Sequence, residues 1–409
     1  MTIQSFNAQE TYTASLAERL HSIANSAPRD TGLLLYYFLT KSKGAYPVDV
    51  VATLERLGIP FLEDEQAHRI TKLTAAIKRP KTGRVSSIFA DPHPADYDWR
   101  FASDSIAVLA DRLFTAAKAK PIALLGTKTL FPYLYDKGAK TTLFNKSAAL
   151  LGDLRQAGYG TGLVECNLCH PLTEGENAYQ VAFADPPWYL DYYQAFLQRA
   201  SELLMPNGTL YLSVLPVLTR PDASVDRAQI LHLAATLGLE LIAEEDAALF
   251  YETPLFEQQA LSAQGLYCNN WRSGDLWVFQ KARQPLTETT VAGRIVEPEW
   301  REYRIGSRRI KVNTQPSNEG KVFSYRSADP EGSVFTQVSR RSPFRNLIDV
   351  WSSDNQAYTV TRSSVLDYYL NELEANDSLE HVSELIRKNH SVSQVERVEL
   401  IALLQELVR

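Results

Sequence analysis

Hydrophobic positions near the start of the chain recur at three- and four-residue steps, the spacing of amphipathic helices. Three segments show this pattern, at residues 15–24, 31–42 and 48–59. Gly44 and Pro47 separate the second segment from the third, and the apolar run after Gly58 predicts a short strand. We therefore predict a winged-helix-like domain over residues 1–95. Winged helices bind DNA or serve as packing domains, and the acidic third helix favours packing.

The pattern changes between Pro121 and Arg283, where short apolar runs alternate with helical segments. Strands are predicted at residues 122–126, 141–145, 160–168, 180–187, 208–216, 239–248 and 275–282. Such alternation predicts a parallel, doubly wound α/β sheet that is Rossmann-like, here over residues 96–283. Ligands of such sheets bind at the carboxyl ends of the strands.

Residues 284–409 form the third predicted region, an accessory α+β domain. Strands rich in Arg and Ser are expected from Trp300 to about Val360, and helices from Ser363 onward. The strongest positive cluster of the chain lies here and consists of Arg308, Arg309, Arg340, Arg341 and Arg345. These arginines would meet phosphates of a partner or form a solvated strand face.

Composition narrows the classes of function. A net charge of −6 over 409 residues lowers the expectation of general nucleic-acid binding, which needs a basic face. Three cysteines are too few for a disulfide framework, and the CxxC of Cys166 and Cys169 lacks enough further ligands for a zinc site. No signal peptide or membrane span is recognisable, so a cytoplasmic protein is expected, without a metal.

The sequence motif FADPPW, at the predicted end of the fourth strand, gives the strongest indication of the chemistry of this chain. Prolines fix the backbone after Asp185, so that the Pro186 carbonyl and the Asp185 carboxylate can accept hydrogen bonds from one amine. Trp188 offers a flat face on which a base or another planar group can stack. We expect Asp185 and Pro186 to hold an amine nitrogen in line for group transfer, which is mainly a matter of positioning and electrostatics.

The motif Asp185-Pro186-Pro187-Trp188 resembles motif IV of the class I S-adenosylmethionine-dependent amino-methyltransferases, whose (D/N)PP(Y/F/W) box acts on exocyclic amines of adenine or cytosine. The same box occurs in protein lysine and glutamine methyltransferases. It is also similar to that of the branched-polyamine aminopropyltransferases, in which a winged-helix-like domain precedes the Rossmann-like one. The resemblance covers about Ala102 to Ala282 and implies a class I methyltransferase fold that binds S-adenosylmethionine.

The resemblance also implies a cofactor site at the ends of the first three strands. Gly126 and Thr127 occupy the place of the glycine-rich loop, reduced here to a single glycine. Asn145 stands where the family has an acidic residue for the ribose, and Asn167 where it often has Asp near the adenine. An asparagine can bond to either group without supplying charge. Phe101 would cover the cofactor as part of a lid, or simply pack before a helix.

Methyl transfer to an amine nitrogen is therefore the leading hypothesis, with an amine-bearing substrate as the partner. Aminopropyl transfer to a polyamine is an alternative, although Lys128 stands in the cofactor loop where carboxylates would suit a polycation. A protein or nucleic-acid amine as acceptor, and a non-enzymatic methyltransferase-like scaffold, are further alternatives. Neither the acceptor nor the oligomeric state follows from the sequence, and a homodimer is compatible with it.

Overall fold

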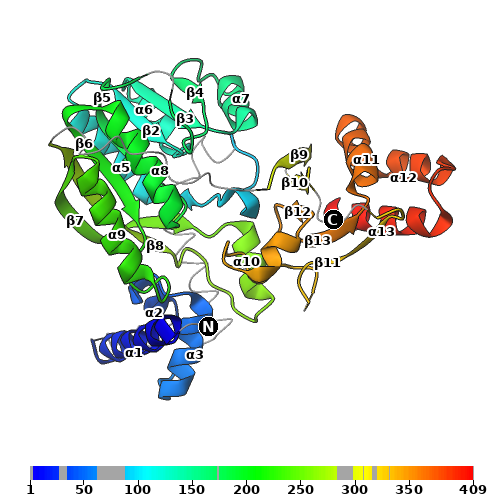
Figure 1. Ribbon diagram of the computed structural model, residues 1–409, viewed down its shortest axis with the longest axis horizontal. Coiled ribbons are helices and arrows are strands. Elements are labelled where there is room, and N and C mark those ends of the chain that lie inside the picture. Colours follow the sequence, from blue (N-terminus) through cyan, green and yellow to red (C-terminus); the bar gives the residue numbers. More distant parts are fainter. Residues whose placement is uncertain are drawn as a thin grey trace. The chain divides into compact units, whose positions relative to one another are not determined.

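The computed structural model (Figure 1) describes residues 3–26, 35–61, 88–172, 175–282, 298–306, 308–315, 320–330 and 332–408. Their contacts group them into two compact units. The first comprises Met1–Phe89, Arg100–Glu252 and Cys268–Ile295, and the second comprises Ala90–Trp99, Thr253–Tyr267 and Val296–Arg409. This grouping differs from the three consecutive ranges expected, because the helical N-terminal part joins the central sheet and two short internal segments join the C-terminal region.

The N-terminal part of the first unit is helical, with α1 (Ile3–Ser26), α2 (Leu35–Lys41) and α3 (Pro47–Leu57). Their apolar faces bury one another through Leu16, Phe38 and Leu54. Gly58 ends α3 in the left-handed conformation that glycine adopts without steric cost. Most of the hairpin expected after α3 lies outside the described residues, so the winged helix stays a prediction.

An eight-stranded sheet forms the centre of the first unit, in the order β1-β7-β8-β6-β5-β2-β3-β4. Its strands are β1 (Arg100–Phe101), β2 (Ile122–Leu125), β3 (Thr141–Asn145), β4 (Leu163–Glu165), β5 (Tyr179–Ala184), β6 (Leu204–Val214), β7 (Leu239–Glu252) and β8 (Ser273–Lys281). Strands β2 to β6 run parallel, and β8 lies antiparallel between β6 and β7. The expectation of an all-parallel sheet is wrong for β8. The connection from β7 to β8 begins and finishes at the same end of these neighbouring strands, so the two run antiparallel.

Helices connect these strands and fix where a ligand can bind. Five helices do so: α5 (Ser103–Ala117), α6 (Leu130–Asp136), α7 (Ala148–Gln156), α8 (Leu190–Leu203) and α9 (Ala223–Thr236). From β2 the chain winds outward through β3 to β4, and then returns to build β5 and β6 on the other side of β2. Because such crossovers are right-handed, the two halves place their helices on opposite faces, and the carboxyl ends of β2 and β5 form the topological switch point, where ligands of such sheets bind.

The second unit is built around a five-stranded antiparallel sheet in the order β11-β13-β12-β10-β9. Its elements are η1 (Pro94–Asp96), α10 (Leu255–Ser262), β9 (Trp300–Ile305), β10 (Arg308–Asn313), β11 (Ser324–Ser327), η2 (Pro343–Leu347), β12 (Val350–Ser352), β13 (Ala357–Thr361), α11 (Ser363–Asn376), α12 (Leu379–Lys388) and α13 (Gln394–Val408). Apolar side chains of the three C-terminal helices and of the sheet share one core, which includes Ile310, Tyr358, Leu370 and Leu404. The expected change from strands to helices near Ser363 is confirmed.

Two strand boundaries differ from the sequence expectation. The third strand of the alternating region spans only Leu163–Glu165, and the strand after α8 begins at Leu204, directly at the end of the helix. The turn expected at Pro206 and Gly208 therefore lies inside β6 and coincides with a register shift against β5. None of the described helices is long and apolar enough to cross a membrane.

Candidate active site

Asp185 lies where β5 ends, at the topological switch point of the sheet. Strand β5 is fully buried from Val181 to Ala184, and Ala184 pairs with Leu125, the last residue of β2. The backbone N–H of Tyr189 donates to the Pro187 carbonyl at 2.6 Å, which closes a turn immediately before α8. The motif thus sits at the carboxyl end of β5, at the topological switch point of the sheet, and the predicted position at a strand end is confirmed.

A chain of hydrogen bonds ends at the Asp185 carboxylate. The Tyr251 hydroxyl, on β7, donates to Asp185 Oδ1 at 2.9 Å, and the Ser213 hydroxyl, on β6, lies 2.7 Å from the same tyrosyl oxygen. Trp188 Nε1, which can only donate, lies 3.4 Å from Ser213 Oγ. Since the tyrosyl proton is directed to Asp185, Ser213 must supply the proton of the Ser213–Tyr251 bond. Each donor therefore points toward Asp185, which is held as an acceptor.

Burial and this chain have opposite effects on the protonation of Asp185. Burial raises the pKa of its carboxyl from 3.8 to about 6, while the Ser213 and Tyr251 hydroxyls and the positive charge of Arg272 lower that pKa. Burial also raises the pKa of Tyr251 well above its ordinary value, and the charge of Asp185 adds to the rise. Asp185 is therefore the group of this site that takes up a proton near neutral pH.

Trp188 is packed into the wall of the site. Only 6% of its surface is exposed, the Arg272 guanidinium carbon lies 4.0 Å from its ring centroid, and Tyr251 meets it edge-to-face at 5.9 Å. A Cβ on Gly274 would come within 3.2 Å of the indole, so a larger residue would crowd the ring where β8 passes behind it. A planar acceptor would therefore stack on the Arg272 guanidinium that covers Trp188, or displace it.

Gly126 and Thr127 follow the end of β2, on the strand next to that of Asp185, since Leu125 pairs with Ala184. Gly126 has a φ of +75°, the left-handed region that favours glycine. Thr127 is buried, and its hydroxyl has no hydrogen-bond partner among the residues that the structure describes. A buried hydroxyl without a partner is costly, and a ligand that hydrogen-bonds it would remove the cost. These residues fit a polar cofactor at the end of β2.

The two predicted asparagines lie at the ends of the next two strands. Asn145 ends β3, and its backbone carbonyl accepts from the N–H of Cys166, which precedes Asn167. Each amide oxygen accepts from a backbone N–H two residues on, Asn145 from Ser147 at 2.9 Å and Asn167 from Cys169 at 3.0 Å. The amide NH2 groups are then the parts that would face a ribose or an adenine. Their roles in binding stay predictions.

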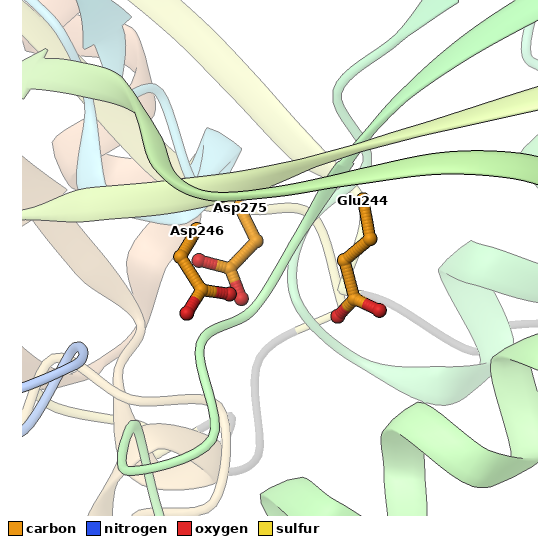
Figure 2. Close-up of side chains that lie close together, drawn as sticks. All are labelled: Glu244, Asp246 and Asp275. Atoms are coloured by element: carbon orange, nitrogen blue, oxygen red, sulfur yellow. The ribbon is translucent and has the colours of Figure 1, made fainter.

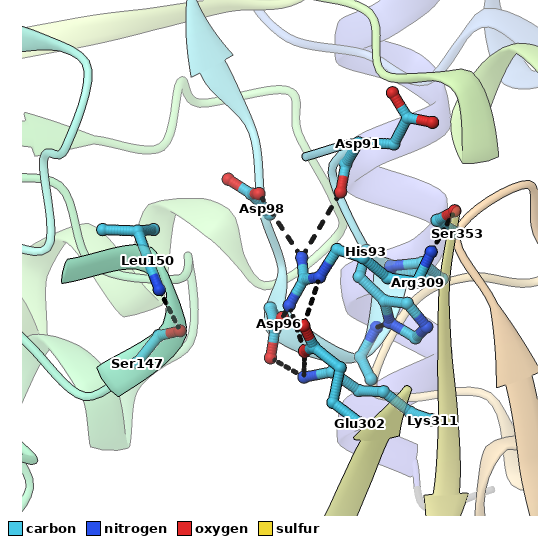
Figure 3. Close-up of polar contacts among 12 residues, drawn as sticks. Asp91, His93, Asp96, Asp98, Ser147, Leu150, Glu302, Arg309, Lys311 and Ser353 are labelled. Atoms are coloured by element: carbon cyan, nitrogen blue, oxygen red, sulfur yellow. Dashed lines mark hydrogen bonds and ion pairs between the residues drawn. The ribbon is translucent and has the colours of Figure 1, made fainter. Parts of the chain in front are cut away.

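Ser147 marks the start of α7 beside Asn145. Its hydroxyl accepts from the Leu150 N–H at 3.2 Å, a bond that Figure 3 shows, and this caps the helix. The side chain of Asn145 and this cap together fix the turn between β3 and α7.

Phe101 lies in β1, an edge strand that pairs with the end of β7. Only 2% of its surface is exposed, and its ring packs against Tyr251 at 4.8 Å and Phe183 at 5.8 Å. This places Phe101 behind the tyrosine that bonds to Asp185, in a strand of the sheet. Its role toward a cofactor is an untested prediction.

Three residues of the site were not found from the sequence: Ser213, Tyr251 and Arg272. Tyr251 reaches Asp185 although 66 residues separate them in the chain, because β7 and β8 fold back beside β6. Ser213 was within reach of sequence analysis, since it occupies the penultimate position of β6, the strand next to the motif strand. Arg272 and Tyr251 carry no local signal.

Three carboxylates cluster at another point of this unit, namely those of Glu244, Asp246 and Asp275 (Figure 2). One oxygen of each lies within 4.8 Å of the others. Arg227, however, bonds to both Glu244 and Asp275, and the Lys43 ammonium lies 3.3 Å from Asp246. Each carboxylate is thus paired with a cation of the same unit, and the cluster is an ion-pair network.

The arginine-rich region of the second unit is likewise paired internally. Arg309 is buried and bonds to Asp96 at 2.5 Å and to Glu302 at 2.6 Å, and Lys311 bonds to Asp96, as Figure 3 shows. Arg345 stacks over Tyr97 at 4.6 Å and donates to a backbone carbonyl. Arg309 and Arg345 of the predicted cluster are therefore engaged within the unit, and binding of a partner here stays untested.

The strand order of the central sheet identifies its fold. Counted without the short edge strand β1, the sheet has the strand order 3-2-1-4-5-7-6 with the seventh strand antiparallel, which is that of the class I methyltransferases. Among solved structures, the branched-chain polyamine synthase C9 mutein from Thermus thermophilus, in complex with N4-aminopropylspermidine and 5'-methylthioadenosine, is 15% identical with a TM-score of 0.51, over 71% of this chain and 95% of that one.

Two further solved structures resemble the chain less closely. The branched-chain polyamine synthase of Thermus thermophilus is 16% identical with a TM-score of 0.49, over 68% of this chain and 90% of that one. The CcbJ methyltransferase of Streptomyces caelestis is 18% identical with a TM-score of 0.32, over 44% and 89%. No family model and no curated protein sequence matches the chain. The chain has the class I methyltransferase fold.

Proposed function

We propose that the protein transfers an alkyl group, in the first place methyl, from S-adenosylmethionine to an amine nitrogen held by Asp185. The observation that carries the proposal is the chain of donors Trp188–Ser213–Tyr251, which holds a buried carboxylate as a hydrogen-bond acceptor at the topological switch point of the sheet. Gly126, Thr127, Asn145 and Asn167 lie at the neighbouring strand ends, where the cofactor would bind.

The residues of this chain then have distinct tasks. When bound, S-adenosylmethionine supplies an electrophilic methyl group on a sulfonium sulfur. Asp185 accepts a hydrogen bond from the amine and takes the proton that nitrogen loses, and the Pro186 carbonyl accepts a second N–H. Tyr251 and Ser213 fix the orientation of the carboxylate, and the buried walls around Trp188 exclude water.

Aminopropyl transfer to an amine is the second candidate. The similarity to the Thermus thermophilus polyamine synthase favours it, because that likeness extends over 71% of this chain. The two activities use the same acceptor chemistry and differ in the sulfonium compound, since decarboxylated S-adenosylmethionine supplies the aminopropyl group.

Calorimetry tests the proposal with S-adenosylmethionine, its decarboxylated form and S-adenosylhomocysteine, combined with a transfer assay. Binding of S-adenosylhomocysteine together with methyl transfer supports the first candidate, and preference for the decarboxylated compound supports the second. The Asp185→Ala variant should lose transfer by about a hundredfold or more while cofactor affinity stays within a few-fold. A protein that binds none of the three compounds would be a scaffold, and normal turnover by the variant would refute the role of Asp185.

A further inference from the structure

A cavity of about 630 Å³ lies at the end of the central sheet opposite to Asp185. The residues that line it come from the last turn of α6, from the segments that lead into β2, β3, β4 and β5, and from the first residues of β3 and β5. Because β5 spans six residues, its two ends are roughly 17 Å apart. A small ligand in this cavity would therefore not touch the motif at the carboxyl end of β5.

The cavity is rich in hydroxyl groups and carries one positive charge. A hydroxyl belongs to each of five lining residues and an ammonium group to a sixth, namely Tyr135, Thr141, Thr142, Thr161, Tyr179 and Lys140. Among the described residues that line the cavity none is acidic, although the net charge of the chain is −6. This lining suits a ligand that has one negative charge and several groups able to form hydrogen bonds.

These polar groups are available to a ligand. Within the part of the chain that the structure describes, the Lys140 ammonium forms no ion pair or hydrogen bond, and its side chain is exposed. The hydroxyls of Thr142 and Thr161 likewise have no protein partner there. Nor do the phenol groups of Tyr135 and Tyr179. A ligand can therefore bond to these groups without breaking a contact within the protein.

Packing holds the two tyrosine rings of the cavity in place. Tyr135 meets Tyr159 edge-to-face at 5.3 Å and lies 5.7 Å from Phe131. Tyr179 is buried and meets Phe144 edge-to-face at 5.9 Å. Because the rings are fixed by the core, their hydroxyls lose little freedom when a ligand binds, so the site is preorganised.

We propose that this cavity is a second ligand site, which binds a small hydroxylated anion such as a sugar phosphate or a sugar acid. The Lys140 ammonium binds the phosphate or carboxylate as a point charge. The threonine and tyrosine hydroxyls, which can both donate and accept, bond to the hydroxyls of the ligand. The proposal is independent of the proposed function, because it uses none of the residues assigned to group transfer.

Calorimetry on the intact chain tests the proposal with glucose 6-phosphate, gluconate and glucose. At least one of the two anions should bind about tenfold or more tightly than glucose, and the tighter of the two identifies phosphate or carboxylate as the charged group. Excess S-adenosylhomocysteine should leave that affinity unchanged. Competition between the two compounds would place the anion in the cofactor site and overturn the proposal.

Variants separate Lys140 from general effects of charge. Lys140→Gln should abolish the preference for the anion over glucose, and Lys140→Arg should keep part of it. Lys120→Gln is the matched control, since Lys120 lies at the same end of the sheet but bonds to Gln180 Oε1 at 3.1 Å and does not line the cavity. It should keep the full preference.

A second variant tests the hydroxyl groups. Tyr179→Phe keeps the packed ring and should weaken binding of the anion by roughly threefold to tenfold, the usual effect of one lost hydrogen bond. An unchanged preference in Lys140→Gln, equal binding of glucose and both anions, failure of all three compounds to bind, or full affinity in Tyr179→Phe would each overturn the proposal. None of these results would affect the proposed function.

Discussion

The ionised form of Asp185, which the proposed reaction needs, destabilises the folded protein because the carboxylate is buried. Because burial raises the pKa of its carboxyl from 3.8 to about 6 in the folded state, the folded protein holds the proton more tightly than the unfolded chain does. The contribution of this proton to the free energy of unfolding is fully present below pH 3.8 and is lost as the pH rises through about 6. Activity that needs the carboxylate appears over the same range.

Asp185→Asn should therefore stabilise the protein, but only at the higher pH. Well above pH 6 we expect the free energy of unfolding of the variant to exceed that of the wild type by on the order of 2 kcal/mol, and the difference to vanish below pH 4. Urea denaturation of both proteins at two pH values measures this. A difference that does not depend on pH would show that Asp185 is not the buried titrating group.

Tyr251 positions Asp185, and its hydroxyl can be removed without changing the ring. Tyr251→Phe deletes the hydrogen bond to Asp185 Oδ1, and the loss should raise the pKa of Asp185 further, by roughly one unit. The acidic limb of the kcat/KM profile should then shift to higher pH while cofactor affinity stays unchanged. Tyr159→Phe is the control, since its hydroxyl lies 3.5 Å from a carboxylate of Asp136 away from the site. An unshifted limb in Tyr251→Phe would contradict a positioning role.

At the scale of elements, the turn between α2 and α3 supports the loop after β6. Gly44 has a φ of +86°, and a Cβ there would lie 2.7 Å from Thr219 Oγ1 and 2.9 Å from Pro216 Cβ. Residues 216–219 lead directly into Arg220. A change in the turn should therefore move the loop after β6 and weaken binding of the acceptor.

Gly44→Ala and Gly58→Ala form a matched pair that separates this contact from backbone strain. Both positions have positive φ, but a Cβ at Gly58 meets nothing within 4 Å. Both variants should lose about 1 kcal/mol to backbone strain. Only Gly44→Ala should also raise KM for the acceptor, because its Cβ must displace the loop. Equal acceptor KM values in steady-state kinetics would show that the turn has no influence on the site.

The sequence predicts elements well where the signal is local. The run from Val181 to Ala184, followed by the prolines and α8, places the motif at a strand end, and the structure agrees. Tyr251 and Arg272 escaped detection because their positions depend on β8 inserting antiparallel between β6 and β7. That insertion is a long-range pairing, and no periodicity in either strand reveals it.

At the scale of the whole molecule, the second unit is stabilised by buried charges from distant parts of the chain. Arg309 meets Asp96, 213 residues earlier, and Glu302 in the same sheet. Arg309→Gln leaves these carboxylates without their main cation and should cost about 3–5 kcal/mol of unfolding free energy. Arg301→Gln, which breaks an exposed pair with Asp367, should cost far less than this, because solvent screens the pair. Thermal unfolding that ranks the two variants equally would refute the buried network.

Contacts between residues far apart in the chain also limited how much of the domain organisation could be predicted from the sequence. His93 is fully buried, accepts the Ala95 N–H at Nδ1 and contacts the Trp351 carbonyl at 2.9 Å through Nε2. Nothing in the neighbouring sequence indicates that this histidine contacts β12, a strand more than two hundred residues later in the chain. A boundary drawn from composition separates partners that the fold unites.

Synthesis of the chain proceeds from the N-terminus, so the three segments of the second unit leave the ribosome at very different times. Ala90–Trp99 and Thr253–Tyr267 emerge before Val296–Arg409, which supplies all five strands that they join. Until then, the fully buried His93 and the nearly buried Phe256 have no sheet to cover them. A nascent chain with an early stop after residue 295 would display both segments to chaperones and proteases, however well the larger sheet had formed.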